Sequence, residues 1–304
     1  MDAPAKLNLG LVVGPLRSDG FHDLATVFQA ISLRDTLMAE RTNRPGFRLR
    51  VAFENAAVRG GARPGAGEIP SGPGNLVLRA ARALADFAPE SEGVSFTLIK
   101  RIPAGAGLGG GSADAAAALR ALERLWGLRL TLAQFRTIAA GLGSDVPFAL
   151  RGGTAGGIGR GDRLTPMHLS SSFHAVVAVP RWRVSTALAY RRLDRLNYGL
   201  TRSARYLRFV QHIGRERTSL MRAVEFGNTF EQVLGTRRTK FESLKRRLTI
   251  AGFTSPQLTG SGSAVFAIAP RGDRARQMVQ QFTGDEAVFI VRSVASGPRC
   301  RRKG

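Results

Sequence analysis

The chain of 304 residues lacks the features that mark several classes of protein. Its single cysteine, Cys300, cannot form an internal disulfide and has no second cysteine with which to share a metal ion. None of the four histidines stands at a ligand-like spacing from another, so we expect no metal site. No apolar run is long enough to cross a bilayer, and residues 1–6 lack the basic start and apolar core of a signal peptide. These absences predict a cytoplasmic protein that does not associate with membranes.

Lysine is also scarce, because only five of the 45 basic residues are lysines. The formal net charge of +23 raises nucleic-acid binding as an alternative function. The arginines are spread through nearly every segment, however, and no aromatic-interleaved RNA-binding motif is present, so we expect no specific nucleic-acid partner. Because the chain uses arginine at most cationic positions, Lys6 and Lys100 indicate sites that need an ammonium in particular. An ammonium is a compact point charge, whereas a guanidinium is a planar fork.

The most informative motif is a glycine loop at residues 103–114, Pro-Ala-Gly-Ala-Gly-Leu-Gly-Gly-Gly-Ser-Ala-Asp. It follows a predicted strand over 94–102 and precedes a predicted helix over 112–126. Five glycines within seven positions let the backbone approach an anion without hindrance from Cβ atoms. We expect Ser112 to cap the helix, whose first N–H groups and dipole favour a phosphate.

Two common phosphate loops do not fit this segment. A dinucleotide-binding loop would be followed by a second parallel strand, whereas residues 132–141 predict another helix. A Walker A loop would need a Lys-Ser or Lys-Thr pair after the glycines, and none follows. The remaining interpretation is a phosphate-binding loop with a serine and an aspartate at the mouth of a helix, the alternative being a glycine-rich turn before a capped helix.

The chain length suggests two domains, with a boundary near residue 158 that gives units at 1–158 and 159–304. In the first unit, residues 3–14 predict an apolar strand with Lys6 and Asn8 side by side on its polar face. In the second unit, predicted strands alternate with helices, which favours a two-layer α+β domain.

Three segments together resemble the GHMP small-molecule kinase superfamily: Pro4 to Leu11, Pro103 to Ala113 and Leu258 to Val265. The match is closer to one member family. Residues 4–9, 19–22, 27–29, 108–114 and 143–148 resemble the 4-diphosphocytidyl-2-C-methyl-D-erythritol kinase family of the non-mevalonate isoprenoid pathway. This resemblance implies an α+β fold with a ribosomal-protein-S5-like N-terminal domain, a ferredoxin-like C-terminal domain and an active site between them. It also implies ATP-dependent phosphorylation of the substrate 2-hydroxyl.

The resemblance implies that Asp145 and Lys6 are catalytic. A carboxylate near the alcohol can accept its proton as the bond to phosphorus forms. The nearby ammonium would keep Asp145 ionised and orient the hydroxyl. The structural alternatives are a helix N-cap for Asp145 and a solvated strand edge for Lys6.

The remaining implied positions fall into two groups. ATP, accompanied by Mg²⁺ held mainly by phosphate and water, is expected at Asn75, Lys100, Pro103, Gly105, Gly107, Leu108, Gly109, Gly110, Gly111 and Ser112. The cytidine-linked substrate is expected at Asn8, Phe21, His22, Thr186, Tyr190, Gly260 and Ser261. In this second group, Phe21 and Tyr190 would sandwich the cytosine and His22 would hydrogen-bond its edge.

Two positions depart from the family pattern. Phe21 stands where the family usually has tyrosine, and Thr229 follows Asn228 where the family generally has aspartate. The alternative enzyme is another kinase of the superfamily, acting on homoserine, mevalonate or a sugar, although Asp19-Gly-Phe-His22 argues against it. We expect a small-molecule substrate and either a monomer or a homodimer.

Overall fold

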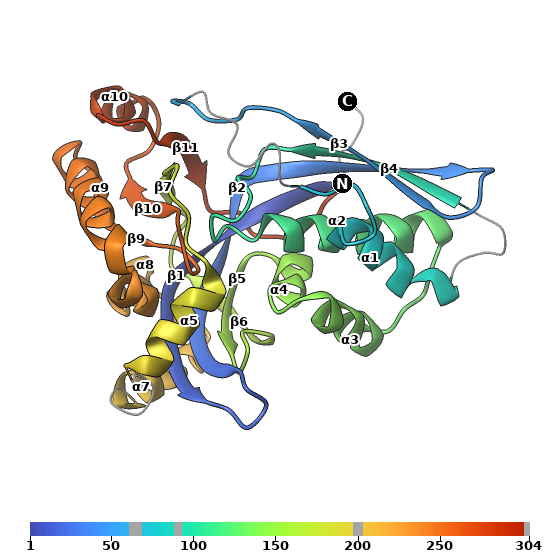
Figure 1. The fold of residues 1–304 in the computed structure, drawn as a ribbon, viewed down its shortest axis with the longest axis horizontal. Helices are drawn as coiled ribbons and strands as arrows, with labels where there is room; N and C mark the ends of the chain where they lie inside the picture. The colour runs from blue at the N-terminus through green and yellow to red at the C-terminus, as the bar shows by residue number, and fades with distance from the viewer. Residues whose placement is uncertain (61–68, 88–92, 197–202, 301–304) are drawn as a thin grey trace.

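The computed structural model describes residues 1–60, 69–87, 93–196 and 203–300. Within these residues the chain forms a seven-stranded sheet and a four-stranded antiparallel sheet (Figure 1). The strand order of the larger sheet is β3-β4-β2-β5-β6-β8, with β1 paired to β2, and that of the smaller sheet is β11-β7-β10-β9. The expected α+β class is confirmed.

The strands and helices have the following bounds. The larger sheet contains β1 (Asp2–Leu16), β2 (His22–Thr42), β3 (Phe47–Phe53), β4 (Gly93–Lys100), β5 (Thr154–Ile158), β6 (Arg163–Leu169) and β8 (Arg217–Thr218). The smaller sheet contains β7 (His174–Val179), β9 (Thr254–Leu258), β10 (Val265–Ala269) and β11 (Ala287–Arg292). The helices are α1 (Leu76–Ala83), α2 (Gly110–Trp126), α3 (Leu132–Leu142), α4 (Val146–Arg151), α5 (Thr186–Arg195), α7 (Ser203–Ile213), α8 (Leu220–Glu225), α9 (Arg238–Ile250) and α10 (Asp273–Gln281), with 3-10 turns η1 (Ala85–Phe87), η2 (Thr229–Val233) and η3 (Gly235–Arg237).

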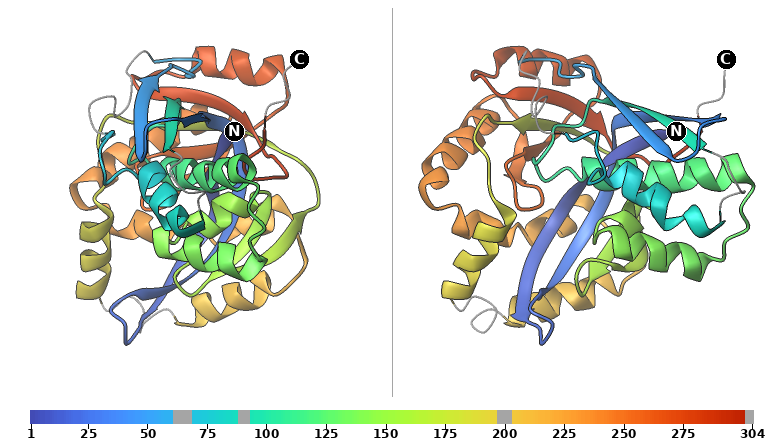
Figure 2. Two further views of the ribbon diagram at one scale, coloured as in Figure 1. Left: turned by 90° about the vertical axis from the view of Figure 1, so that its right-hand side faces the viewer. Right: turned by 45° about the vertical axis from the view of Figure 1, so that its right-hand side comes forward.

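Strands β1 and β2 form a long antiparallel hairpin that runs through the molecule (Figure 2). The apolar side chains of β1, such as Leu7 and Leu9, are fully buried in the main core. The predicted polar face is buried as well, with Lys6 7% and Asn8 2% exposed. A buried polar side chain needs hydrogen-bond partners, so Lys6 and Asn8 must be held by other polar groups of the protein.

Helix α2 begins earlier than expected. Its N-cap is Gly109, which has a left-handed backbone with φ 70°, and no side chain caps the helix. The expectation that Ser112 is the N-cap was wrong, because the glycine backbone turns into the helix three residues before it. The alanine-rich run of α2 is fully buried, since small side chains let the helix lie close to the sheet.

The helix expected after α2 is confirmed. Thr131 and Gln134 form a reciprocal capping box at the start of α3, where a dinucleotide-binding fold would place a strand. Helices α1 to α4 lie together beside the larger sheet, and α9 and α10 lie beside the smaller one (Figure 1). The segment expected to be helical at 228–235 consists of the 3-10 turns η2 and η3.

The expected boundary at residue 158 falls between β5 and β6, which pair in the same sheet. The smaller sheet begins at β7, and the chain returns to the larger sheet near its end, where Asp2 N–H donates to the Arg299 carbonyl at 2.8 Å. The division into two domains therefore stays a prediction, and a boundary between β6 and β7 fits the two sheets better. No helix among the described residues is long and apolar enough to span a membrane.

Candidate active site

Lys6 and Asp145 come from different elements and meet at one point. The Lys6 ammonium lies 3.6 Å from Asp145 Oδ2, with 8% and 33% of the two side chains exposed. Asp145 precedes α4 at the N-cap position, but its side chain makes no cap hydrogen bond. Its carboxylate is therefore available to the cavity, as the catalytic interpretation requires and the capping alternative does not.

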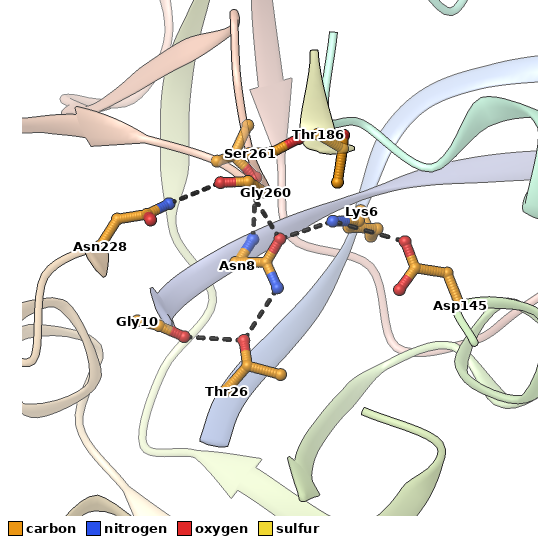
Figure 3. A network of polar contacts seen from close by, with 10 residues as sticks. Lys6, Asn8, Gly10, Thr26, Asp145, Thr186, Asn228, Gly260 and Ser261 are labelled. Atoms are coloured by element: carbon orange, nitrogen blue, oxygen red, sulfur yellow. Dashed lines mark hydrogen bonds and ion pairs between the residues drawn. The ribbon is translucent and has the colours of Figure 1, made fainter. Parts of the chain in front are cut away.

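Asn8 organises the polar face of β1 (Figure 3). Its Oδ1 accepts from the Lys6 ammonium at 2.5 Å and from Gly260 N–H at 2.9 Å, and its Nδ2 donates to Thr26 Oγ1 at 2.8 Å. Thr26 in turn donates to the Gly10 carbonyl at 2.7 Å. The buried amide thus fixes the Lys6 ammonium and links β1 to the turn at 259–263.

The glycine loop lies against both Lys6 and this turn. A Cβ on Gly109 would be 2.9 Å from Lys6 Cγ and 3.7 Å from Asp145 Oδ2, and a Cβ on Gly107 would be 2.2 Å from the Thr259 carbonyl. Both glycines have positive φ, 70° and 82°. A Cβ would clash with the Lys6 side chain at Gly109 and with backbone at Gly107, so glycine is required here for contact as well as for conformation.

These segments line a cavity of about 870 Å³. Thirteen of the predicted site residues line it: Lys6, Asn8, Phe21, His22, Gly105, Gly107, Gly109, Ser112, Asp145, Thr186, Tyr190, Gly260 and Ser261. Thr186 and Ser261 are joined by a hydroxyl hydrogen bond of 2.6 Å, which connects α5 to the turn at 259–263. The cavity thus brings together predicted ATP-binding residues and predicted substrate-binding residues from segments far apart in the chain.

The other predicted residues lie outside the lining of this cavity. Asn75 caps α1 by accepting from Val77 N–H at 2.9 Å. Pro103 and Leu108 are buried, and the Leu108 carbonyl accepts from Lys6 N–H at 3.0 Å. Gly110 and Gly111 belong to the first turn of α2. Their expected roles at ATP stay predictions.

Lys100 is engaged inside the protein. Its ammonium contacts the buried carboxylates of Asp35 and Asp114, the latter at 2.6 Å. Burial opposes its charge, but the two aspartates outweigh this and raise the pKa of Lys100. Burial, with the charge of Asp35, raises the pKa of Asp114 to about 8, although Lys100 opposes the rise. The Lys100 ammonium is thus directed at these two aspartates, and its expected place at ATP stays a prediction.

The Asp35–Lys100–Asp114 cluster fixes the two ends of the glycine loop. Asp35 Oδ1 accepts from the N–H groups of Arg101 and Ile102, at 2.5 and 2.8 Å, immediately before the loop. A Cβ on Gly110 would lie 3.3 Å from the Lys100 ammonium. The cluster therefore joins β2, the end of β4 and the first turns of α2.

The expected aromatic sandwich has a different arrangement in the structure. The ring of His22 stacks on Tyr190 at a centroid distance of 5.4 Å, and Phe230 meets the edge of Tyr190 at 5.1 Å. Phe21 instead lies under the Arg160 guanidinium, at 4.4 Å. Burial and the charge of Asp145 raise the pKa of Tyr190 to about 12, so its hydroxyl stays protonated at neutral pH.

Among the lining residues that sequence reasoning did not assign to the site, three have polar side chains: Ser144, Arg160 and Asp194. Asp194 Oδ1 lies within hydrogen-bonding distance of His22 Nε2, at 2.7 Å. Asp194 follows Tyr190 at the four-residue spacing by which Tyr190 follows Thr186. This spacing would have been a usable signal only if the helix had been expected to continue through residue 194. The pairing of Arg160 with Phe21 had no local signal.

Thr229, which departs from the family pattern, contacts the backbone of β1. Its hydroxyl accepts from Val13 N–H at 3.2 Å, and the side chain is fully buried. The adjacent Asn228 donates to the carbonyls of Leu258 and Gly260, at 2.9 and 2.8 Å. This segment thus supports the turn at 259–263.

Residues 75–153 match the model of the GHMP kinases N terminal domain. A 4-diphosphocytidyl-2-C-methyl-D-erythritol kinase of Salinispora tropica is 50% identical over 194 residues, but the match spans only 64% of this chain and 58% of that protein. The protein of the same name from Nocardia farcinica is 36% identical over 97% of this chain and 92% of its own length. The one from Solibacter usitatus is 40% identical over 98% and 89%.

Solved structures show the same relationship. The crystal structure of a 4-(cytidine 5'-diphospho)-2C-methyl-D-erythritol kinase is 32% identical, with a TM-score of 0.70 over 98% of this chain and all of that one. A homoserine kinase from Cytophaga hutchinsonii shares the fold, with a TM-score of 0.66 at 17% identity over 97% and 94% of the two chains.

Proposed function

The chain belongs to the 4-diphosphocytidyl-2-C-methyl-D-erythritol kinase family, and from that membership we propose that it transfers the γ-phosphoryl group of ATP to the 2-hydroxyl of 4-diphosphocytidyl-2-C-methyl-D-erythritol. The observation that carries the proposal is the Lys6–Asp145 pair, 3.6 Å apart, beside the glycine loop in a common cavity.

The glycine loop suits the phosphates of ATP. Gly105 has a positive φ of 67° and open space where a Cβ would stand. Helix α2, which follows, has 17 residues and no side-chain cap, so its first N–H groups and its dipole are available to an anion. Gly111 lies against Leu76, so the start of α1 with Asn75 borders the loop on the side where we place adenine.

The substrate hydroxyl is placed between Lys6 and Asp145. As its oxygen bonds to the γ-phosphorus, the bond from that phosphorus to the β,γ-bridging oxygen breaks and ADP leaves. Asp145 accepts the hydroxyl proton, and Lys6, held by Asn8, orients the reacting oxygen. We place Mg²⁺ on the ATP phosphates, because this cation keeps most of its waters.

We assign the cytidine end of the substrate to the aromatic residues of the cavity. Phe21, His22 and Tyr190 line the cavity and are the residues to which we assign it, and Tyr190 offers a neutral aromatic face. Stacking on an aromatic ring contributes about 1–3 kcal/mol per base. Phe21 has the aromatic ring of the tyrosine usual in the family and lacks only its hydroxyl, so we expect it to retain stacking on the cytosine.

The direct test is a coupled ADP-release assay of the full chain with ATP, Mg²⁺ and the cytidylylated substrate, beside homoserine, mevalonate and a sugar panel. We expect ADP release with the cytidylylated alcohol and inhibition by CDP. Release with homoserine or mevalonate alone would instead assign the chain to another activity of the superfamily. Equal release without any alcohol would reject a small-molecule kinase.

A further inference from the structure

Arg160 reaches the candidate active site from the tight turn between β5 and β6. The glycines on either side of it, Gly159 and Gly161, have positive φ values of 71° and 90°. The Gly159 carbonyl accepts from Leu24 N–H at 2.8 Å, which ties the turn to β2. The side chain of Arg160 lines the same cavity of about 870 Å³ as the proposed catalytic pair. The turn thus brings a guanidinium to the wall of this cavity.

The other charged side chains of the cavity lining face a partner within the protein. The Lys6 ammonium lies 3.6 Å from Asp145, and Asp194 lies 2.7 Å from His22 Nε2. Arg160, in contrast, forms no ion pair and donates no hydrogen bond within the described part of the chain, and its Nε is buried without an acceptor. An arginine in a cavity lining is normally paired, because a desolvated charge needs compensation.

Packing on an aromatic ring holds the guanidinium in place. It lies over the ring of Phe21, 4.4 Å from the centroid. This contact leaves the N–H donors at the edge of the planar guanidinium. Asp19 bonds to Arg17 at 2.9 Å, and its pKa is lowered chiefly by this hydrogen bond, with a smaller contribution from the charge of Arg160. The terminal N–H groups of Arg160 are therefore available to an anion in the cavity.

Arg160 is adjacent to both ends of the proposed substrate site. It contacts Phe21, one of the aromatic residues to which we assign the cytidine. In the other direction, the ring of Phe28 separates its turn from Lys6. The Lys6 ammonium lies 5.7 Å from the centroid of that ring, and a Cβ on Gly161 would be 3.6 Å from its Cζ. A ligand that extends from Phe21 to Lys6 thus has its middle part near Arg160.

We propose that Arg160 binds the diphosphate of the substrate and so favours a diphosphate-linked alcohol over one without a diphosphate. In a cytidylylated alcohol the diphosphate joins the nucleoside to the alcohol, so it is the middle part of the molecule. The planar fork of a guanidinium matches phosphate oxygens, and hydrogen bonds between charged groups are stronger than those between neutral ones. The inference rests on the proposed function, because it takes the substrate to span the cavity in this direction.

The test is isothermal titration of the full chain with CDP and with cytidine. A saturating nonhydrolysable ATP analogue with Mg²⁺ is present, so that CDP does not bind at the glycine loop. For the wild type we expect CDP to bind at least about 30-fold more tightly than cytidine, because hydrogen bonds to charged groups contribute one to two factors of about ten. In Arg160→Gln we expect CDP to bind at least about tenfold more weakly and cytidine to stay within about threefold, since cytidine has no phosphate.

Two further variants separate a specific contact from general attraction by a chain of net charge +23. Arg160→Lys keeps the charge but not the planar fork, so we expect it to lose less CDP affinity than Arg160→Gln. Arg163→Gln removes the same charge from an exposed arginine three positions later, outside the lining of this cavity, and we expect the wild-type affinities. In the ADP-release assay, Arg160→Gln should raise the KM for the cytidylylated substrate at least about tenfold and change kcat by less than about threefold.

The outcomes distinguish this inference from the proposed function. An unchanged ratio of CDP to cytidine affinity in Arg160→Gln, or an equal loss of CDP affinity in Arg163→Gln, would overturn the diphosphate contact and leave the kinase assignment standing. The same holds if the wild type binds CDP no more tightly than cytidine. A wild type that releases no ADP with the cytidylylated alcohol would reject the proposed function, whereas the titrations would still measure the contact of Arg160 with a diphosphate.

Discussion

Asp114→Asn tests the buried cluster that anchors the glycine loop. Asp35, Lys100 and Asp114 are 0%, 4% and 3% exposed, so two ionised aspartates would leave a net negative charge in the interior. Burial and the charge of Asp35, opposed by Lys100, raise the pKa of Asp114 from 3.8 to about 8. Buried ion pairs of this kind are weak sources of stability.

The sign of the pH effect follows from that pKa. Between 3.8 and about 8 the folded protein holds a proton on Asp114 that the unfolded chain releases. Proton binding by Asp114 therefore favours the folded state. This contribution is complete below the unfolded pKa of 3.8 and is lost as the pH rises through the folded pKa of about 8. At about 1.4 kcal/mol per pH unit, the loss from about pH 5 to about pH 8 amounts to about 4 kcal/mol.

Asparagine removes this titration while keeping the side-chain size. We expect the unfolding free energy of Asp114→Asn, relative to wild type, to rise by up to about 4 kcal/mol from about pH 5 to about pH 8. Urea unfolding of both proteins across that range measures it, because titrating groups remote from Asp114 cancel in the difference. Asp86→Asn, at an exposed aspartate, should show a flat difference. A flat difference for Asp114→Asn as well would refute the reasoning.

Three further substitutions probe the site itself. Gly107→Ala should lower kcat/KM for ATP at least about tenfold, since its Cβ would be 2.2 Å from the Thr259 carbonyl. The control is Gly105→Ala, which has a similar φ but open space around the added Cβ, and it should lower kcat/KM less in the same assay. Asn8→Ala should lower the unfolding free energy by about 3 kcal/mol, measured in urea, because it leaves the Lys6 ammonium and Gly260 N–H without their buried acceptor. His22→Ala should raise the KM for the cytidylylated substrate more than it lowers kcat; equal effects would contradict a binding role.

Local sequence patterns predicted the parts of the site that lie on single elements. Alternation along β1 placed Lys6 beside Asn8, and the glycine run predicted the loop before α2. The cap of α2 was missed because Ser112 is a common capping residue, whereas Gly109 takes the cap position with a left-handed backbone packed against Lys6. Propensity describes a residue alone and not the contact that overrides it.

Contacts across long separations were the least predictable. Lys100 pairs with Asp35, 65 positions away, and His22 with Asp194, 172 positions away. No local pattern joins such residues, so the pairing of Lys100 with Asp35 was not foreseen and Asp194 was not singled out. The helical spacing of Asp194 from Tyr190 was visible, but the partner on β2 was not.

The central claim is that Asp145 accepts the proton of the alcohol during phosphoryl transfer. The most direct measurement is ADP release by Asp145→Asn with ATP and the cytidylylated substrate at saturation, with CDP affinity measured in parallel. The proposal predicts turnover lower by at least about 100-fold with CDP affinity unchanged. Turnover close to that of the wild type would contradict it.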